Sequence, residues 1–277
     1  MTAKALVLCA CCLALAGCGN QNNPVQTVAA SPVEGRALQA ETDAGRPIGQ
    51  EDVPVTGRRR YVAFESRAAN LTTTDTNGVT DVFVYDNDSK QTVRVSISSS
   101  GVQGNGGSFS PALTPDGRVV VFESLATNLV RDDTNRQRDI FVHDRMTDLT
   151  TRASVDSSGN QANNFSQSAQ LSADGRCVVF ESLASNLVSG DTNGVIDVFV
   201  HDRQTGRTSR VSVGNDGTQA NNASVNPTIS ADGRYVRFES FATNLLPVTP
   251  EQAKQVFVYD LKTGAIQQVP AGSRAAG

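Results

Sequence analysis

The chain has 277 residues and a formal net charge of −4. It contains no long run of lysine or arginine, which excludes the usual electrostatic signature of nucleic-acid binding, so we expect no nucleic acid partner. Glycine is frequent, with 23 residues, and tryptophan is absent. Ser, Thr, Asn and Asp gather in short turn-like segments, a mixture that favours many short strands over a helical bundle. The length suits one large all-β domain or two small ones.

The first residues have the character of an export signal. Lys4 supplies a positive charge, and the apolar run Ala5–Ala16 has 12 residues, too few to span a bilayer. The run ends in Leu15-Ala16-Gly17-Cys18, which resembles the lipobox of bacterial lipoproteins. This resemblance implies a signal peptide at 1–17, acylation of Cys18 by fatty acids such as palmitate, and a membrane anchor at that cysteine. The alternative is an ordinary secretory signal that happens to contain cysteine.

Residues 18–56 follow, with scattered proline and glycine and no regular apolar period. We interpret them as a disordered tether. Its last part, Glu51–Thr56, has the alternative of forming a strand that completes the first repeat unit. Gly19 stands where an aspartate would imply retention in an inner membrane. The lipoprotein resemblance therefore implies an extracytoplasmic location in the cell envelope, at the outer membrane or in the periplasm if the host has two membranes.

A 58-residue repeat occupies residues 57–270. The phrase Phe-Glu-Ser recurs four times in this step, beginning at Phe64, Phe122, Phe180 and Phe238. A second phenylalanine keeps the same step at Phe83, Phe141, Phe199 and Phe257. Such self-similarity indicates a fold whose units bury one another's faces, so these aromatic residues belong to a repeated core. We expect units at about 57–106, 107–164, 165–222 and 223–270, followed by a tail at 271–277.

Each unit is predicted to hold four short strands. An Asp-Gly turn, such as Asp116-Gly117, joins the first two, because its glycine supplies the positive φ that a tight hairpin needs. The second strand is apolar on both faces, with Val119 and Val121 on one and Val120 and Phe122 on the other. Such a strand requires a layer above and a layer below. The predicted fold class is therefore an all-β propeller of four four-stranded blades.

The first unit departs from the pattern, because Arg58, Arg59 and Arg60 replace its Asp-Gly-Arg turn and it lacks a clear first strand. We favour a closed four-bladed disc. An open arrangement that pairs with another chain is the alternative, because open sheet edges invite pairing.

The pattern Ser-x-Ser-Pro-x-Leu-Thr-Pro-Asp-Gly-Arg from Ser108 to Arg118 resembles the WD40-like propeller repeats of the TolB type. The resemblance covers about 57–270 and implies a propeller. The repeat exceeds the roughly 40–45 residues of a WD40 blade, with the extra length between the second and third strands. The chain also has no separate N-terminal domain of the TolB kind, so we do not expect a translocation role like that of TolB.

The added loop contains a motif of alternating oxygen-bearing side chains that resembles short calcium loops. Calcium binds 6–8 oxygens at about 2.3–2.6 Å. In the second copy, Arg131 and Arg136 oppose a cation, and the fourth copy has lost the set. The alternative is that these residues close the turn by Asx hydrogen bonds. We expect no other cofactor. The candidate calcium ligands are Asp75, Asn77 and Asp81 in the first copy and Asp191, Asn193 and Asp197 in the third.

Two further sets follow the repeat. Glu65, Glu123, Glu181 and Glu239 would form either a cation-binding ring or, as we favour, ordinary partners of backbone and arginine. The histidines His143 and His201 share a position that holds tyrosine in the other units, which favours packing over catalysis. Cys177, far from the other cysteines, is interpreted as a buried apolar residue.

No nucleophile and base stand outside the repeat pattern, so the chain is predicted not to be an enzyme. We expect a membrane-anchored, extracytoplasmic interaction module whose loops bind an envelope protein or a surface polymer. A calcium-stabilised propeller that binds carbohydrate or peptide is the first alternative, and a propeller hydrolase is the second.

Overall fold

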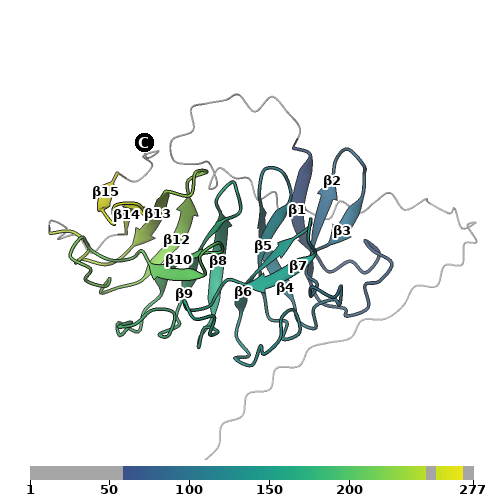
Figure 1. The fold of residues 1–277 in the computed structure, drawn as a ribbon, viewed down its shortest axis with the longest axis horizontal. Helices are drawn as coiled ribbons and strands as arrows, with labels where there is room; N and C mark the ends of the chain where they lie inside the picture. Colours follow the sequence, from purple (N-terminus) through teal and green to yellow (C-terminus); the bar gives the residue numbers. More distant parts are fainter. Residues whose placement is uncertain (1–58, 248–253, 271–277) are drawn as a thin grey trace, which may run out of the picture. The chain divides into compact units, whose positions relative to one another are not determined.

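The computed structural model describes residues 59–247 and 254–270, and this part of the chain forms strands β1 to β15 without a helix (Figure 1). The strands make four antiparallel sheets in chain order, each with its strands in sequence order. The first sheet holds β1 (Tyr61–Ser66), β2 (Asp81–Asp86) and β3 (Thr92–Arg94). The second holds β4 (Ser108–Leu113), β5 (Val119–Ser124), β6 (Asp139–Asp144) and β7 (Leu149–Arg152).

The third and fourth sheets repeat the second. The third holds β8 (Ser166–Leu171), β9 (Cys177–Ser182), β10 (Asp197–Asp202) and β11 (Arg207–Arg210). The fourth holds β12 (Ser224–Ile229), β13 (Tyr235–Ser240), β14 (Gln255–Asp260) and β15 (Ile266–Val269). The predicted fold class, an all-β propeller of four repeated sheets, is confirmed.

One difference concerns the first sheet, which has three strands within the described residues rather than four. The segment Glu51–Thr56, which would supply the fourth, lies outside those residues, as do Cys18, the signal at 1–17 and the tail at 271–277. In the part of the chain that the structure describes, no helix has the length and hydropathy that a membrane span requires.

The core lies between consecutive sheets, and the second and third sheets are buried on both faces. In the second sheet one face carries Val119, Val121, Ile140 and Val142, and we call the corresponding side of any sheet its valine face. It packs against the opposite side of the third sheet, the phenylalanine face, defined there by Val178, Phe180 and Phe199. Within each phenylalanine face the two rings stack, with centroids 5.6 to 6.0 Å apart.

The same junction occurs three times. A second buried cluster joins the valine face of the first sheet to the phenylalanine face of the second, and a third joins the third sheet to the fourth. Within the described residues, every substantial contact between sheets joins consecutive sheets. The repeated sequence thus produces one type of interface, used repeatedly.

The Asp-Gly turns are shaped by these junctions. Gly117 has a φ of +71°, which strains any residue with a side chain, and a Cβ there would lie 2.2 Å from the Tyr61 ring of the first sheet. Gly175 and Gly233 occupy the same place at the next two junctions, with φ of +70° and +73°. Glycine is therefore needed for the turn itself and, most acutely at Gly117, for the close approach of the neighbouring sheet.

Candidate functional site

The predicted calcium loop of the first copy is folded around hydrogen bonds of its own. Asn77 Nδ2 donates to Asp81 Oδ2 at 3.0 Å, and Asn77 Oδ1 accepts the backbone N–H of Val79 at 3.0 Å. Ser96 Oγ donates to Asp81 Oδ1 at 2.6 Å. The bond between Asn77 and Val79 is an Asx-type contact that closes a turn. The structure therefore brings Asn77 and Asp81 together, as the motif predicts.

A guanidinium lies where the motif would place a cation. Arg94 Nη1 is 3.4 Å from Asp75 Oδ1 and 3.4 Å from Asp81 Oδ2, and all three side chains are at most 7% exposed. We call this arrangement the arginine cluster. It recurs in the second and third sheets. There, Arg152 lies 3.3 Å from Asp133 and 3.4 Å from Asp139, and Arg210 lies 3.0 Å from Asp191 and 3.4 Å from Asp197.

The arginine cluster holds two buried carboxyl groups against one positive charge. Burial raises the pKa of Asp133 and of Asp139, and the charge of Asp139 adds to the effect on Asp133. In the third sheet, burial likewise raises the pKa of Asp191 and of Asp197. Because the pKa values of these carboxyl groups are raised, the protonation of the cluster depends on pH.

The sequence reasoning missed the arginines. Arg94, Arg152 and Arg210 follow the same 58-residue step as the aspartates, and the fourth copy replaces both partners, with Gln255 for the aspartate and Gln268 for the arginine. The joint loss of the aspartate and the arginine in the fourth copy was the signal in the sequence that could have indicated their pairing. Among the described residues no group of three His, Cys, Asp or Glu side chains is arranged to hold a metal ion. Calcium binding by Asp75, Asn77, Asp81, Asp191, Asn193 and Asp197 stays a prediction.

Three of the four glutamates connect neighbouring sheets, whereas Glu239 contacts Asn226 and Lys254 of its own unit. A β-bulge in the first strand of the second, third and fourth sheets gives one residue a left-handed backbone, with φ of 50° to 56°. The N–H of that residue donates to the glutamate of the preceding sheet. The pairs are Ser110 to Glu65 at 2.7 Å, Ser168 to Glu123 at 2.8 Å and Asn226 to Glu181 at 2.6 Å. These glutamates are thus partners of backbone, as we favoured from the sequence.

The histidines and the body cysteine lie in packed surroundings. His143 Nδ1 is 2.9 Å from Thr150 Oγ1, and His201 makes the same contact with Thr208. Burial lowers the pKa of both histidines, which favours the neutral ring. Burial also raises the pKa of Cys177 to about 11, so its thiol stays protonated and weakly nucleophilic.

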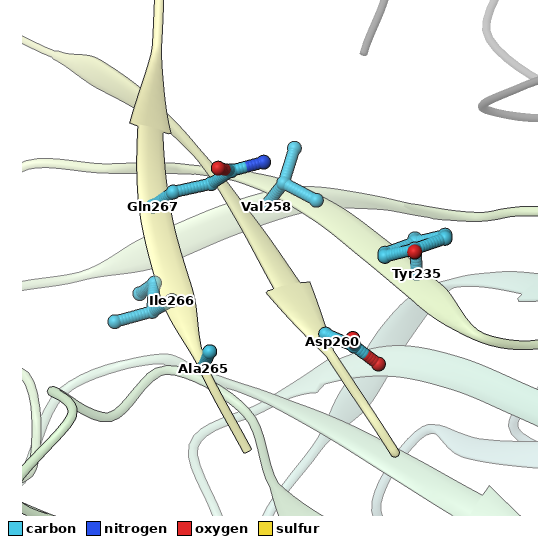
Figure 2. A pocket seen from close by; sticks show the side chains of 6 residues that line it. All are labelled: Tyr235, Val258, Asp260, Ala265, Ile266 and Gln267. Atoms are coloured by element: carbon cyan, nitrogen blue, oxygen red, sulfur yellow. The ribbon is translucent and has the colours of Figure 1, made fainter. Parts of the chain in front are cut away.

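A pocket of about 290 Å³ opens on the valine face of the fourth sheet. Tyr235, Val258 and Gln267, from β13, β14 and β15, lie in a row along it (Figure 2). Asp260 adds a carboxylate that accepts two hydrogen bonds from Arg234, at 3.1 and 2.8 Å. Sites for small ligands usually measure about 300–1,000 Å³, so this pocket lies at the small end of that range.

Two exposed apolar residues share one repeat position at one end of the sheets. We call the loop edge the end at which β1, β5, β9 and β13 finish. The residue that follows is Leu125 in the second sheet, Leu183 in the third and Phe241 in the fourth, all at one repeat position. Leu125 is 47% exposed and Phe241 is 41% exposed. Large apolar side chains repeated at one exposed place offer a surface for binding.

Comparison with known proteins gives matches to structures only. No model of a known protein family matches the sequence, and no curated protein matches it. TolB from Acinetobacter baumannii is 18% identical with a TM-score of 0.43, over 76% of this chain and 40% of that chain. A putative TolB from Agrobacterium tumefaciens is 14% identical with a TM-score of 0.45, over 76% and 60%. The match spans less than two thirds of either protein, and the predicted TolB-type resemblance is confirmed for the fold alone.

Other matched structures are enzymes. A prolyl endopeptidase is 11% identical with a TM-score of 0.46, over 77% of this chain and 28% of that chain. The tricorn protease, an acylaminoacyl peptidase and an oligogalacturonate lyase also match. The prediction that this chain is not an enzyme, which rested on finding no nucleophile and base outside the repeat pattern, is therefore wrong as an exclusion, because several matched propeller structures are enzymes. That exclusion is withdrawn.

Proposed function

We propose that the chain is a membrane-anchored, extracytoplasmic propeller that binds another component of the cell envelope through its loop edge. The observation that carries the proposal is the repeated exposure of Leu125 and Phe241 on loops held by rigid sheets. Burying a large apolar side chain completely contributes about 1.5–3 kcal/mol, and a binding partner would supply the part of it that the present exposure leaves. Binding residues gather on loops that a rigid scaffold positions.

The loops around these residues are rigidly held, which favours binding without a large ordering cost. Beside Leu125, Asn105 Oδ1 accepts the N–H of Thr127 at 2.8 Å, and Asn128 Oδ1 accepts the N–H of Asn105 at 2.9 Å. The same pair of contacts recurs at the loop of Phe241, where Asn221 Oδ1 accepts the N–H of Thr243 at 2.9 Å and Asn244 Oδ1 accepts the N–H of Asn221 at 3.0 Å. The apolar side chains therefore project from loops that are already closed by their own hydrogen bonds.

The test is cross-linking in intact cells with formaldehyde. We expect the chain to give a discrete cross-linked product that disappears in the variant carrying both Leu125→Asp and Phe241→Asp. Leu149→Asp is the matched control, because Leu149 is 49% exposed but starts β7, at the opposite end of the sheet from Leu125. A product that survives the double substitution, or that Leu149→Asp removes equally, would overturn the proposed binding surface.

The anchor is tested separately. Cys18 is proposed to carry the fatty acids, so cells fed radiolabelled palmitate should label the chain, and Cys18→Ser should abolish the label. We expect the unlabelled variant to leave the membrane fraction. Continued labelling of the Cys18→Ser chain, or no labelling of the original chain, would refute the lipoprotein assignment without affecting the loop edge.

A further inference from the structure

The base of the loop between the second and third strands differs from one sheet to the next. One residue follows the second strand, and the strand register sets it opposite the residue that precedes the third strand. The pairs are Leu125 with Arg138, Leu183 with Ile196 and Phe241 with Lys254. Leu125 and Phe241 are exposed, whereas Leu183 is partly buried. In these three sheets the apolar side chain is therefore exposed where a cation stands opposite it.

The two cations at the loop base are already paired. Arg138 Nη1 lies 3.0 Å from Glu123 Oε2, and Lys254 Nζ lies 2.8 Å from Glu239 Oε2. Their charges are balanced within their own sheets. A charge that is available to a partner must come from other residues of the loops.

The loop of the second sheet, residues 125–138, adds two such charges. Arg131 and Arg136 are exposed, and among the described residues neither side chain forms an ion pair or donates a hydrogen bond. The corresponding loop of the third sheet, residues 183–196, contains no lysine or arginine. Of the two neighbouring aspartates, Asp132 is exposed, while Asp133 is held by the buried Arg152 at 3.3 Å. Two unpaired guanidiniums thus distinguish this loop from its equivalent in the next sheet.

Arg136 is held in a conformation that suits glycine. Its φ is +57°, and the residues at the same position in the first and third sheets are Gly78 and Gly194, with φ of +69° and +66°. A Cβ added to either glycine would meet no atom within 4 Å. The arginine therefore strains its backbone and projects from a position that offers no packing contact. Strain without a packing gain is typical of residues that serve binding or catalysis.

The backbone on both sides of Arg136 is anchored. Asn135 Nδ2 donates to Asp139 Oδ2 at 2.8 Å and to the Ala162 carbonyl at 2.9 Å. The N–H of Gln137 donates to Asn135 Oδ1 at 2.9 Å. The guanidinium therefore starts from a fixed position, which lowers the entropy that a partner must remove on binding.

We propose that residues 125–138 bind an acidic segment of a partner protein, with Leu125 packing on an apolar side chain of that segment and Arg131 and Arg136 pairing with its carboxylates. This inference rests on the proposed loop-edge function and names the chemistry of the partner at that site. A guanidinium binds a carboxylate through two parallel N–H···O bonds. Burying Leu125 requires an apolar surface, which a peptide side chain supplies better than the hydroxyl groups of a sugar. The combination favours a protein over an acidic polysaccharide.

The first experiment measures the formaldehyde product of intact cells for the full chain carrying both Arg131→Glu and Arg136→Glu. We expect at least tenfold less product than from the original chain, because carboxylates would then face carboxylates. Arg207→Glu is the matched control and should leave the product unchanged. Arg207 is exposed and starts β11, at the end of its sheet opposite the loop edge.

The outcomes separate this inference from the proposed function. If the double reversal leaves the product intact while Leu125→Asp with Phe241→Asp removes it, the loop edge binds a partner but the acidic segment is excluded. An equal loss from Arg207→Glu would also overturn the inference. No product from the original chain would remove the proposed function and this inference together.

Arg136→Gly distinguishes lost binding from lost folding. Restoring glycine relieves the strained backbone, so the melting temperature should rise, while the cross-linked product should fall at least threefold. A chain that is more stable and yet binds less cannot owe the loss to unfolding. An unchanged amount of product from Arg136→Gly would contradict a role for the guanidinium.

A zero-length cross-link tests the chemistry of the partner directly. The full chain carrying Arg136→Lys is treated in isolated cell envelopes with a carbodiimide, which joins an amine to a carboxylate, and the linked peptides are identified by mass spectrometry. We expect residue 136 to be joined to a glutamate or aspartate of another protein, and Arg207→Lys to give no such link at residue 207. A link from residue 136 to a uronic acid would replace the protein segment by an acidic polysaccharide. That result, or no link at residue 136, would overturn the proposal.

Discussion

The first three sheets and the fourth sheet share one backbone but differ at the arginine cluster. Arg94, Arg152 and Arg210 each lie buried between two aspartates, whereas the fourth sheet has Gln268 and Gln255 at the corresponding positions. β14 nevertheless pairs with β13 and β15 as β6 pairs with its neighbours. The comparison teaches that the cluster is dispensable as a whole, while each charged member depends on the others.

Removing one member of the arginine cluster should have the largest effect. Arg152→Ala leaves Asp133 and Asp139 buried without their counter-charge, and losing one partner of a buried ion pair costs about 3–5 kcal/mol. We expect that loss in the free energy of unfolding, measured by urea titration. Gln268→Ala, at the equivalent and exposed position of the fourth sheet, should change it by no more than about 0.5 kcal/mol. Equal effects would break the comparison.

Placing the glutamines of the fourth sheet into the third sheet should sharpen the comparison between these two sheets. Asp197→Gln and Arg210→Gln are each expected to destabilise the protein, but together they should cost less than their sum by about 0.5–3 kcal/mol, since contacting residues couple. The four proteins of this double-mutant cycle are compared by the same titration. Strict additivity would mean that the two side chains, 3.4 Å apart, do not act as a unit.

The charge excess predicts a pH dependence. Burial raises the pKa of Asp191 and Asp197 above the ordinary value of 3.8. A raised carboxyl pKa contributes stability that is full below 3.8 and is lost as pH rises through the raised pKa. The protein carrying Asp191→Asn and Asp197→Asn should therefore gain stability relative to the original as pH rises from 4 to 7. A difference that is constant with pH would contradict the assignment.

Arginine pairs elsewhere lower the pKa of their aspartates, which gives the opposite dependence of stability on pH. The test therefore compares the variant with the original protein at each pH. Arg176 lowers the pKa of Asp202 to about 2, chiefly by its side-chain hydrogen bond. Stability from this group is present above the ordinary pKa and is lost as pH falls through about 2. The contribution of Asp202 is the same in the original protein and in the double variant, so it cancels when their stabilities are compared.

The smallest expected effect concerns calcium. With Arg210 Nη1 only 3.0 Å from Asp191, a divalent cation would have to displace a guanidinium, so exchanging calcium for a chelator should leave the melting temperature of the original chain unchanged. The Arg210→Gln chain should gain stability from calcium, because its aspartates then lack a counter-charge. If calcium raised the melting temperature of the original chain alone, the result would favour the calcium hypothesis instead.

The sheets could be predicted from the sequence because each is set by local pattern. The 58-residue spacing of Phe64 and its copies placed the core, and the Asp-Gly turns placed the hairpins, as β5 and β6 show. The alternation of Val121 and Phe122 correctly required layers on both sides. These features depend on neighbours in sequence or on the step of the repeat.

The site was less predictable because it depends on pairings between units. The bulge at Ser110 has no glycine to announce its φ of 50°, and its N–H is directed at Glu65, a residue 45 positions away. The arginine cluster escaped notice because Arg94 lies 13 residues beyond Asp81, on a different strand. Oxygen-bearing side chains at alternate positions suit a metal or a guanidinium equally, and only the fold brings the arginine to them.

The hydrogen bonds between sheets have a consequence for how such a chain can grow. Ser99 Oγ accepts the N–H of Thr150 at 2.9 Å, and Ser157 makes the identical bond to Thr208 one unit later. The second unit therefore carries both halves of this attachment, because its Thr150 donates to the unit before it and its Ser157 accepts from the unit after it. Duplicating the part of the gene that encodes an internal 58-residue unit would insert a unit that can make these bonds with both neighbours. Lengthening the array therefore requires no new type of contact.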